Sequence, residues 1–122
     1  MKIRKIILKS GTEILLGKDA DSNDELVKKF KGKGNVILHT AKPGSPFCVI
    51  EKLKPTKEEI KEAGIYCARY SQDWRDNKKN VEVHVFDGKS VKKPLLAKKG
   101  SWKLTKEPKI ITIKKKEIEK LK

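Results

Sequence analysis

Residues 55–74, PTKEEIKEAGIYCARYSQDW, contain the strongest helical pattern of the chain and largely decide its fold. Thr56 and Glu59 have the spacing of a capping box, which opens a helix at this point. Small and apolar residues then recur every three or four positions. The members of this stripe are Ile60, Ala63, Gly64, Cys67, Ala68, Ser71 and Trp74. The pattern predicts one long helix, from Thr56 to about Trp74, whose small-residue side lies close against a sheet.

Short β-branched and aliphatic runs on both sides of this helix predict the strands of that sheet. The clearest run is 80–86, NVEVHVF, in which valines alternate with other residues at the period of a strand. Ser10-Gly11 and Asp87-Gly88 are turn dipeptides beside such runs. The predicted strands are residues 2–9, 12–17, 35–40, 47–53, 80–86, 101–105 and 109–114.

A second, shorter helix is predicted after the first two strands, where Ser22 and Glu25 have capping-box spacing. The resulting order, ββαββαβββ, predicts an α+β fold with a mostly antiparallel sheet and one short and one long helix on one face. A length of 122 residues predicts a single domain, residues 1–122, around one modest core. We expect a basic C-terminal tail, about 114–122, to extend as a frayed helix.

The chain is strongly basic, with 31 lysines and arginines against 16 aspartates and glutamates and a net charge of +15. Residues 28–54 contain seven basic and one acidic side chain, and residues 89–122 contain thirteen and three. Nearly all of the cations are lysines, which act as mobile point charges suited to phosphate. This segregation predicts a basic face for a polyanionic partner.

Other classes of protein receive little support from the sequence. No apolar run approaches the roughly 20 residues that span a bilayer, and the N-terminus does not have the pattern of a signal peptide, so we expect a cytoplasmic protein without a membrane partner. Cys48 and Cys67 are predicted to be free buried thiols, with no metal site. No catalytic constellation surrounds His39 or His84, and no phosphate loop is present. We therefore expect no enzyme activity and no cofactor.

Two loops and one histidine are candidates for phosphate and base contacts. The connection 89–100 presents two lysine pairs around a proline, and the loop 42–46, KPGSP, offers a cation, a hydroxyl and backbone amides. His39, at the end of a predicted strand, lies beside the second loop. In the alternative interpretation both loops are ordinary solvated loops, and His39 is a half-buried histidine bonded to a backbone carbonyl. The candidates from this reasoning are His39, Lys42, Ser45, Lys92, Lys93, Lys98 and Lys99.

Several blocks of the sequence, from about residue 11 to 114, resemble one known family in order. They are GKD at 17–19 with ND-x-L at 23–26; HT-x-x-PGS at 39–45; A-x-x-x-CA-x-YS at 63–71; V-x-V at 81–83; VKKP-x-x-AK-x-G at 91–100; and IITI at 110–113. On these blocks the chain resembles NFACT-R (DUF814-type), the RNA-binding domain of NFACT proteins, as a stand-alone member. The resemblance adds Lys18 to the candidate nucleic-acid-binding residues.

Two positions differ from the family pattern. The segment 35–39, NVILH, keeps only the histidine of the family's Asp-x-Trp-Phe-His, and Pro46 stands in place of a second histidine. Trp74 and Trp102 are the tryptophans that remain to stack on a base.

The resemblance implies an RNA-binding module that contacts tRNA or rRNA, or the ribosome, through a lysine-rich face in translation or ribosome quality control. Two alternatives use the same lysines. The chain could instead be a protein-interaction or scaffold module whose lysines only solubilise it, or a DNA-binding protein.

Overall fold

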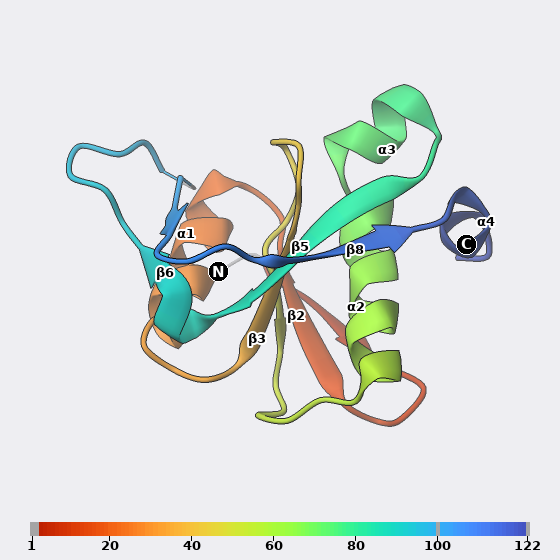
Figure 1. Ribbon diagram of the computed structural model, residues 1–122, viewed down its shortest axis with the longest axis horizontal. Helices are drawn as coiled ribbons and strands as arrows, with labels where there is room; N and C mark the ends of the chain where they lie inside the picture. The colour runs from red at the N-terminus through yellow and green to blue at the C-terminus, as the bar shows by residue number, and fades with distance from the viewer. Residues whose placement is uncertain (1–2, 100, 122) are drawn as a thin grey trace.

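Six strands form one antiparallel sheet in the order β1-β2-β4-β3-β5-β8 in the computed structural model, which describes residues 3–99 and 101–121 (Figure 1). The strands are β1 (Ile3–Ile7), β2 (Glu13–Gly17), β3 (Val36–Thr40), β4 (Cys48–Ile50), β5 (Val81–Asp87) and β8 (Lys109–Ile113). A separate pair joins β6 (Val91–Lys92) to β7 (Lys103–Leu104). The predicted α+β class and antiparallel sheet are confirmed. Residue 2 of the first predicted strand, Gly100 and residue 122 lie outside the described residues.

Four α-helices accompany the sheet, where the sequence predicted two and a frayed end. They are α1 (Ala20–Phe30), α2 (Lys57–Arg69), α3 (Gln72–Asn77) and α4 (Lys115–Glu119), and a short 3-10 helix, η1 (Gly88–Ser90), follows β5.

The predicted start of α2 is confirmed, but its predicted end is wrong. The Thr56 hydroxyl accepts from the Glu59 amide at 3.1 Å, and the Glu59 carboxylate accepts from the Thr56 amide at 2.8 Å. The helix ends at Arg69, because Ser71 leaves the helical conformation and caps α3 by accepting from the Trp74 amide at 3.1 Å. A hydroxyl that competes for backbone donors has divided one predicted helix into two.

Helix α1 begins earlier than its sequence pattern predicted. Its N-cap is Asp19, whose carboxylate accepts from the Ser22 amide at 2.8 Å. Ser22 Oγ in turn accepts from the Asp19 amide at 3.0 Å, so Ser22 is the third residue of the capping box rather than its first.

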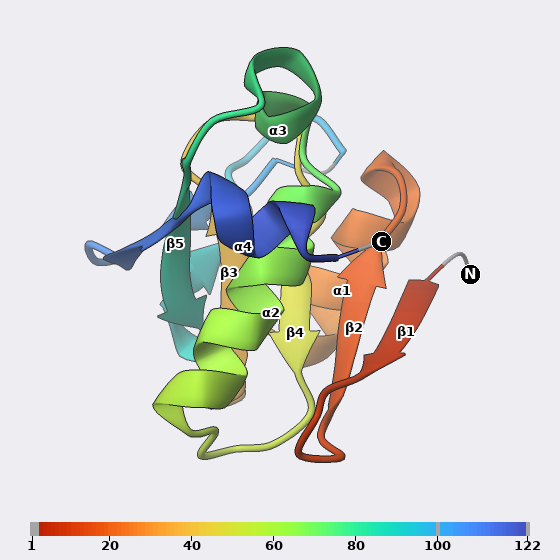
Figure 2. The same cartoon turned by 90° about the vertical axis from the view of Figure 1, so that its right-hand side faces the viewer.

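Helices cover both faces of the sheet, which contradicts the expectation of one covered face and one core (Figure 2). Ala63 and Cys67 of α2 pack with Leu38 in one buried cluster, whereas Leu26 of α1 packs with Ile37 in another. Strand β2 shows the reason, because Ile14, Leu15 and Leu16 are 0%, 3% and 0% exposed. A strand buried on both faces has a continuous apolar run instead of an alternating one.

The C-terminal residues are packed rather than frayed. Ile118 of α4 is fully buried against the α2 side of the sheet, and the Lys115 amide donates to Asn80 Oδ1 at 2.9 Å. Helix α4 and the connection after β6 lie at opposite ends of the molecule (Figures 1 and 2). The lysines of residues 89–122 therefore do not form the single face that their clustering in the sequence predicted.

Candidate nucleic-acid interface

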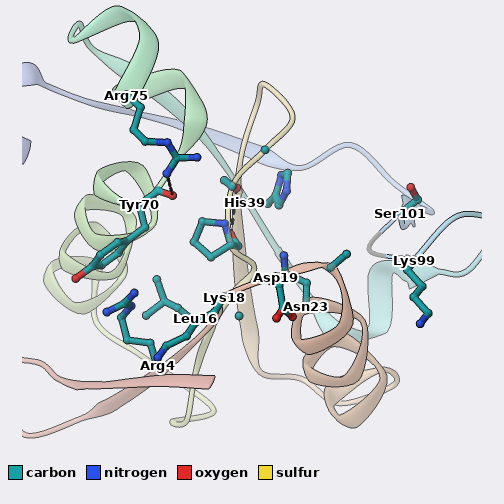
Figure 3. Close-up of a pocket in the computed structure, with 15 residues that line it drawn as sticks. Arg4, Leu16, Lys18, Asp19, Asn23, His39, Tyr70, Arg75, Lys99 and Ser101 are labelled. Atoms are coloured by element: carbon teal, nitrogen blue, oxygen red, sulfur yellow. Dashed lines mark hydrogen bonds between the residues drawn. The ribbon is translucent and has the colours of Figure 1, made fainter. Parts of the chain in front are cut away.

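A hollow of about 540 Å³ opens where β2, β3, α1 and the α2–α3 junction meet (Figure 3). We call it the cationic pocket. Its lining residues are Arg4, Leu16, Gly17, Lys18, Asp19, Ala20, Asn23, His39, Gly44, Ser45, Pro46, Tyr70, Arg75, Lys99 and Ser101. Four cationic residues from distant parts of the sequence line it: Arg4, Lys18, Arg75 and Lys99. The Lys99 side chain points away from the other three (Figure 3), and its ammonium group lies 2.8 Å from Asp21. Asp19 is the one carboxylate among the lining residues.

Tyr70 organises the two arginines of the pocket. The Arg4 guanidinium lies 4.1 Å from the centre of the Tyr70 ring, a cation–π contact. Arg75 Nη1 donates to the Tyr70 carbonyl oxygen at 3.3 Å, and its Nη2 donates to Gln72 Oε1 at 2.9 Å. The unpredicted break between α2 and α3 thus places Arg75 at the pocket.

Neither arginine was a candidate in the sequence analysis. The chain contains only three arginines among its many lysines, and two of them line this pocket. Because a guanidinium can bind phosphate in a bidentate manner, the rarity of arginine was the sequence feature that could have identified them.

The turn between β2 and α1 presents Lys18 at the pocket. The Lys18 amide donates to Ser22 Oγ at 2.8 Å, and Asn23 Oδ1 accepts from the Phe47 amide at 3.0 Å. A Cβ atom at Gly17 would lie 2.0 Å from Asn23 Oδ1, so this close approach requires glycine. The exposed Lys18 side chain is therefore mounted on a tightly bonded backbone.

His39 is half-buried and lines the pocket, so it has features of both interpretations that the sequence allowed. Its Nδ1 lies 2.8 Å from the Thr40 carbonyl oxygen, and its ring centre lies 4.5 Å from that of Phe47. Burial lowers the pKa of His39, and nearby His84 lowers it further. The neutral form of His39 is therefore favoured, and burial is the main cause. Since a carbonyl only accepts, Nδ1 carries the proton and Nε2 is left as an acceptor.

The loop at 42–46 is built by its own hydrogen bonds. Ser45 Oγ accepts from the Thr40 amide at 3.0 Å and donates to the Pro46 carbonyl at 3.1 Å, so this predicted ligand also shapes the loop. The Gly44 carbonyl accepts from the Gln72 amide at 2.8 Å, which ties the loop to α3. Lys42 is exposed and lies 3.6 Å from Asp73, outside the pocket lining.

The lysines of the connection after β6 have different environments. Lys93 Nζ donates to Asp24 Oδ1 at 2.7 Å and to the Lys98 carbonyl at 3.0 Å, which holds the connection against α1. Lys99 lies 2.8 Å from Asp21, whose hydrogen bond raises the pKa of Lys99. Lys92 lines a separate hollow with Pro94 and Lys103, and Lys98 is exposed. Of the eight predicted residues, the pocket brings together Lys18, His39, Ser45 and Lys99.

The described part of the chain offers no candidate for a metal site, a membrane-spanning helix or a disulfide. Among residues 3–99 and 101–121, no group of three His, Cys, Asp or Glu side chains is arranged to hold a metal ion. Within the same ranges no helix is sufficiently long and apolar to cross a membrane. Cys48 and Cys67 are free and buried, as predicted, and burial raises the pKa of Cys67 to about 12.

The sequence and the fold are similar to those of known proteins. An archaeal Rqc2 homologue, aRqcH of Methanocaldococcus jannaschii, is 28% identical over 68 residues, which are 54% of this chain and 10% of that protein. The Rqc2 homologue RqcH of Streptococcus suis is 33% identical over 90 residues, 73% of this chain and 16% of that protein. The chain thus spans a small part of either relative.

A solved structure has the same fold. The C-terminal part of the fibronectin/fibrinogen-binding protein of Streptococcus suis superimposes with a TM-score of 0.85 at 26% identity, covering 100% of this chain and 49% of that one. The sequence profile of the NFACT protein RNA-binding domain matches residues 2–106. Because that match covers most of the chain, the protein belongs to the NFACT RNA-binding domain family.

Proposed function

We propose that this protein is an RNA-binding module whose cationic pocket contacts the phosphates of tRNA or rRNA during ribosome quality control. The observation that carries the proposal is that Arg4, Lys18 and Arg75, from separate parts of the chain, line one hollow, with Lys99 at its edge. Family membership supports RNA as the polyanion, and the Rqc2 homologues support a role at the ribosome.

The geometry suits a sequence-tolerant contact with an RNA backbone. Arg4 and Arg75 are oriented by Tyr70 and offer planar, paired donors, whereas Lys18 and Lys99 add mobile charge at the rim. Phosphate contacts of this kind position a nucleic acid and carry little sequence information. The module therefore acts by binding, and no chemical step at the RNA is part of the proposal.

The salt dependence of binding tests the proposal. The parent and the variant K18A/R75A/K99A are titrated with a labelled tRNA at several salt concentrations. Loss of three phosphate contacts should flatten the log–log salt slope by about 2 and weaken binding. The matched control K57A/K116A/K120A removes the same charge from α2 and from the region around α4, and it should retain nearly the parental slope.

Equal slopes for the two variants would contradict the assignment of the pocket, because charge alone would then explain the binding. Parallel titrations with duplex DNA distinguish an RNA module from a DNA-binding protein. No binding of either nucleic acid by the parent would leave the scaffold interpretation.

A further inference from the structure

A second hollow, of about 320 Å³, adjoins the cationic pocket and shares His39, Gly44 and Ser101 with it. We call it the aromatic hollow. Its lining residues are His39, Thr40, Ala41, Pro43, Gly44, Phe47, His84, Phe86, Ser101, Trp102 and Leu104. Its volume lies at the lower end of the range for small-molecule sites.

Rings from two paired strands and a neighbouring residue form the inner wall of the aromatic hollow. His39 of β3 lies directly opposite His84 of β5, so both side chains project from the same face of the sheet. Phe47 packs against His39 and lies edge-on to Phe86, with ring centres 6.5 Å apart. Both phenylalanines are largely buried, and their rings therefore give the hollow a fixed apolar wall.

Trp102 contributes another ring and is held in place by α1. Its indole Nε1 donates to Asp24 Oδ1 at 3.1 Å, and Lys93 Nζ lies 4.9 Å from the indole ring centre. The Lys93 ammonium group lies over the Trp102 ring, and Lys93 is not among the residues that line the hollow. Trp74, by contrast, is buried in the cluster on the α2 side of the sheet.

We infer that the aromatic hollow binds one unstacked base of an RNA strand whose phosphates lie in the cationic pocket, an inference that rests on the proposed function. Aromatic rings bind the π-face of any base, and sequence-tolerant sites for single strands pair such rings with a cationic groove. The two hollows provide these two elements on either side of His39. The ligand class is therefore RNA with an unpaired nucleotide, and a continuous duplex does not satisfy the site.

His39 adds a polar requirement at the boundary of the two hollows. Its neutral ring already donates from Nδ1 to Thr40, which leaves Nε2 to accept a hydrogen bond. A phosphate oxygen cannot supply a proton to that atom, whereas a ribose 2′-hydroxyl or an exocyclic amine can. His39 thus favours a nucleotide that presents a hydrogen-bond donor, on its ribose or its base, at the boundary of the two hollows.

Tryptophan fluorescence tests the inference directly, because the chain contains only Trp74 and Trp102. The variant W74F leaves Trp102 as the single tryptophan, excited selectively over the two tyrosines, and is titrated with single-stranded hexauridylate and with a blunt RNA duplex. Hexauridylate should quench Trp102 emission with the same midpoint as its binding curve measured by anisotropy. The duplex should bind through its phosphates without that quenching. In the control W102F, where the remaining Trp74 is buried, emission should not change.

Affinity measurements provide a second readout that does not depend on the folding of W74F. W102L should weaken hexauridylate binding roughly 5- to 150-fold, the equivalent of one lost base–aromatic stack, and should leave duplex binding nearly unchanged. H84A, which removes the cross-strand neighbour of His39 from the same wall, should change binding in the same direction by a smaller factor. Unchanged hexauridylate affinity in both variants, with no quenching of Trp102, would overturn the inference while the salt-dependent binding upheld the proposed function. Failure of the parent to bind any RNA would overturn both.

Discussion

Glu59 connects the first turn of α2 to the β1–β2 hairpin through a nearly buried carboxylate. It accepts from Ser10 Oγ at 2.6 Å and from Thr12 Oγ1, in addition to the Thr56 amide that it caps. Lys52 Nζ lies 3.1 Å away. These hydrogen bonds, those of Ser10 and Thr12 first, hold the pKa of Glu59 well below its ordinary value.

The depressed pKa of Glu59 predicts an acid-sensitive contribution to folding. A carboxyl group with a lower pKa in the folded state stabilises the protein above its unfolded pKa of about 4.3, and this stability is lost as the pH falls below that value. At pH 7, E59Q should unfold at a lower urea concentration than the parent. The difference between the two urea midpoints should shrink towards pH 3. E58Q, which changes an exposed neighbour in the same turn, should follow the parent at every pH. If the urea midpoints of E59Q and the parent differed by the same amount from pH 7 to pH 3, Glu59 would stabilise the protein independently of its charge.

His39 makes a prediction about RNA binding that differs in kind from those for the lysines. H39A should weaken binding of a single strand by about 1–2 kcal/mol, as for a lost base contact, with almost the same salt slope because no fixed charge is removed. H39F keeps a ring beside Phe47 but has no Nε2 acceptor. A comparison of H39F with H39A therefore separates the effect of the lost acceptor from the effect of lost packing. If H39A melts earlier yet binds like the parent, then His39 has only a structural role.

At the scale of elements, α2 lies against the sheet because its contact side is small, as the spacing of Ala63, Gly64 and Cys67 predicted. A Cβ atom at Gly64 would lie 3.0 Å from Ile111 Cδ1 and 3.1 Å from Ile113 Cδ1. G64L should therefore overpack the contact and reduce the free energy of unfolding by about 1–3 kcal/mol in urea denaturation. G64A is the matched control, because its strain is partly offset by a gain in helix propensity of about 1 kcal/mol. A G64L variant as stable as the parent would contradict this packing.

The connection after β6 is an element whose position depends on one lysine. Lys93 bridges Asp24 and the Lys98 carbonyl, and this bridge places Lys99 at the cationic pocket. K93A should speed amide hydrogen exchange of residues 95–99 while lowering global stability by less than about 1 kcal/mol, as for a partly exposed ion pair. K92A removes the neighbouring exposed cation and should leave that exchange unchanged. Equal exchange in the two variants would mean that the bridge does not order the connection.

At the scale of the whole molecule, the sequence predicted the local elements better than their assembly. Capping chemistry at Thr56 and the alternation of 80–86 depend on neighbours in the chain, and both predictions are confirmed. The second covered face was missed because three consecutive apolar residues in β2 do not reveal which helix buries which of them. Four predicted ligands line the pocket, but the sequence did not identify Arg4 and Arg75. Both contact Tyr70 there, a residue distant from Arg4 in the sequence. Charge counts along the chain likewise did not predict that the lysines of α4 lie at the opposite end of the molecule from the connection after β6.

The sheet has two open edges, at β1 and β8, and their residues bear on solubility. Each edge strand exposes a large aliphatic side chain, with Ile7 61% and Ile110 57% exposed. An exposed apolar edge is a template on which a second chain can add its own strand, which is the first step of aggregation. Lys5 and Lys109 are exposed on these same strands, and a lysine on an edge discourages such pairing by burying a charge in it. These two lysines therefore have a use that does not involve RNA, because they disfavour the addition of a further strand at either margin of the sheet.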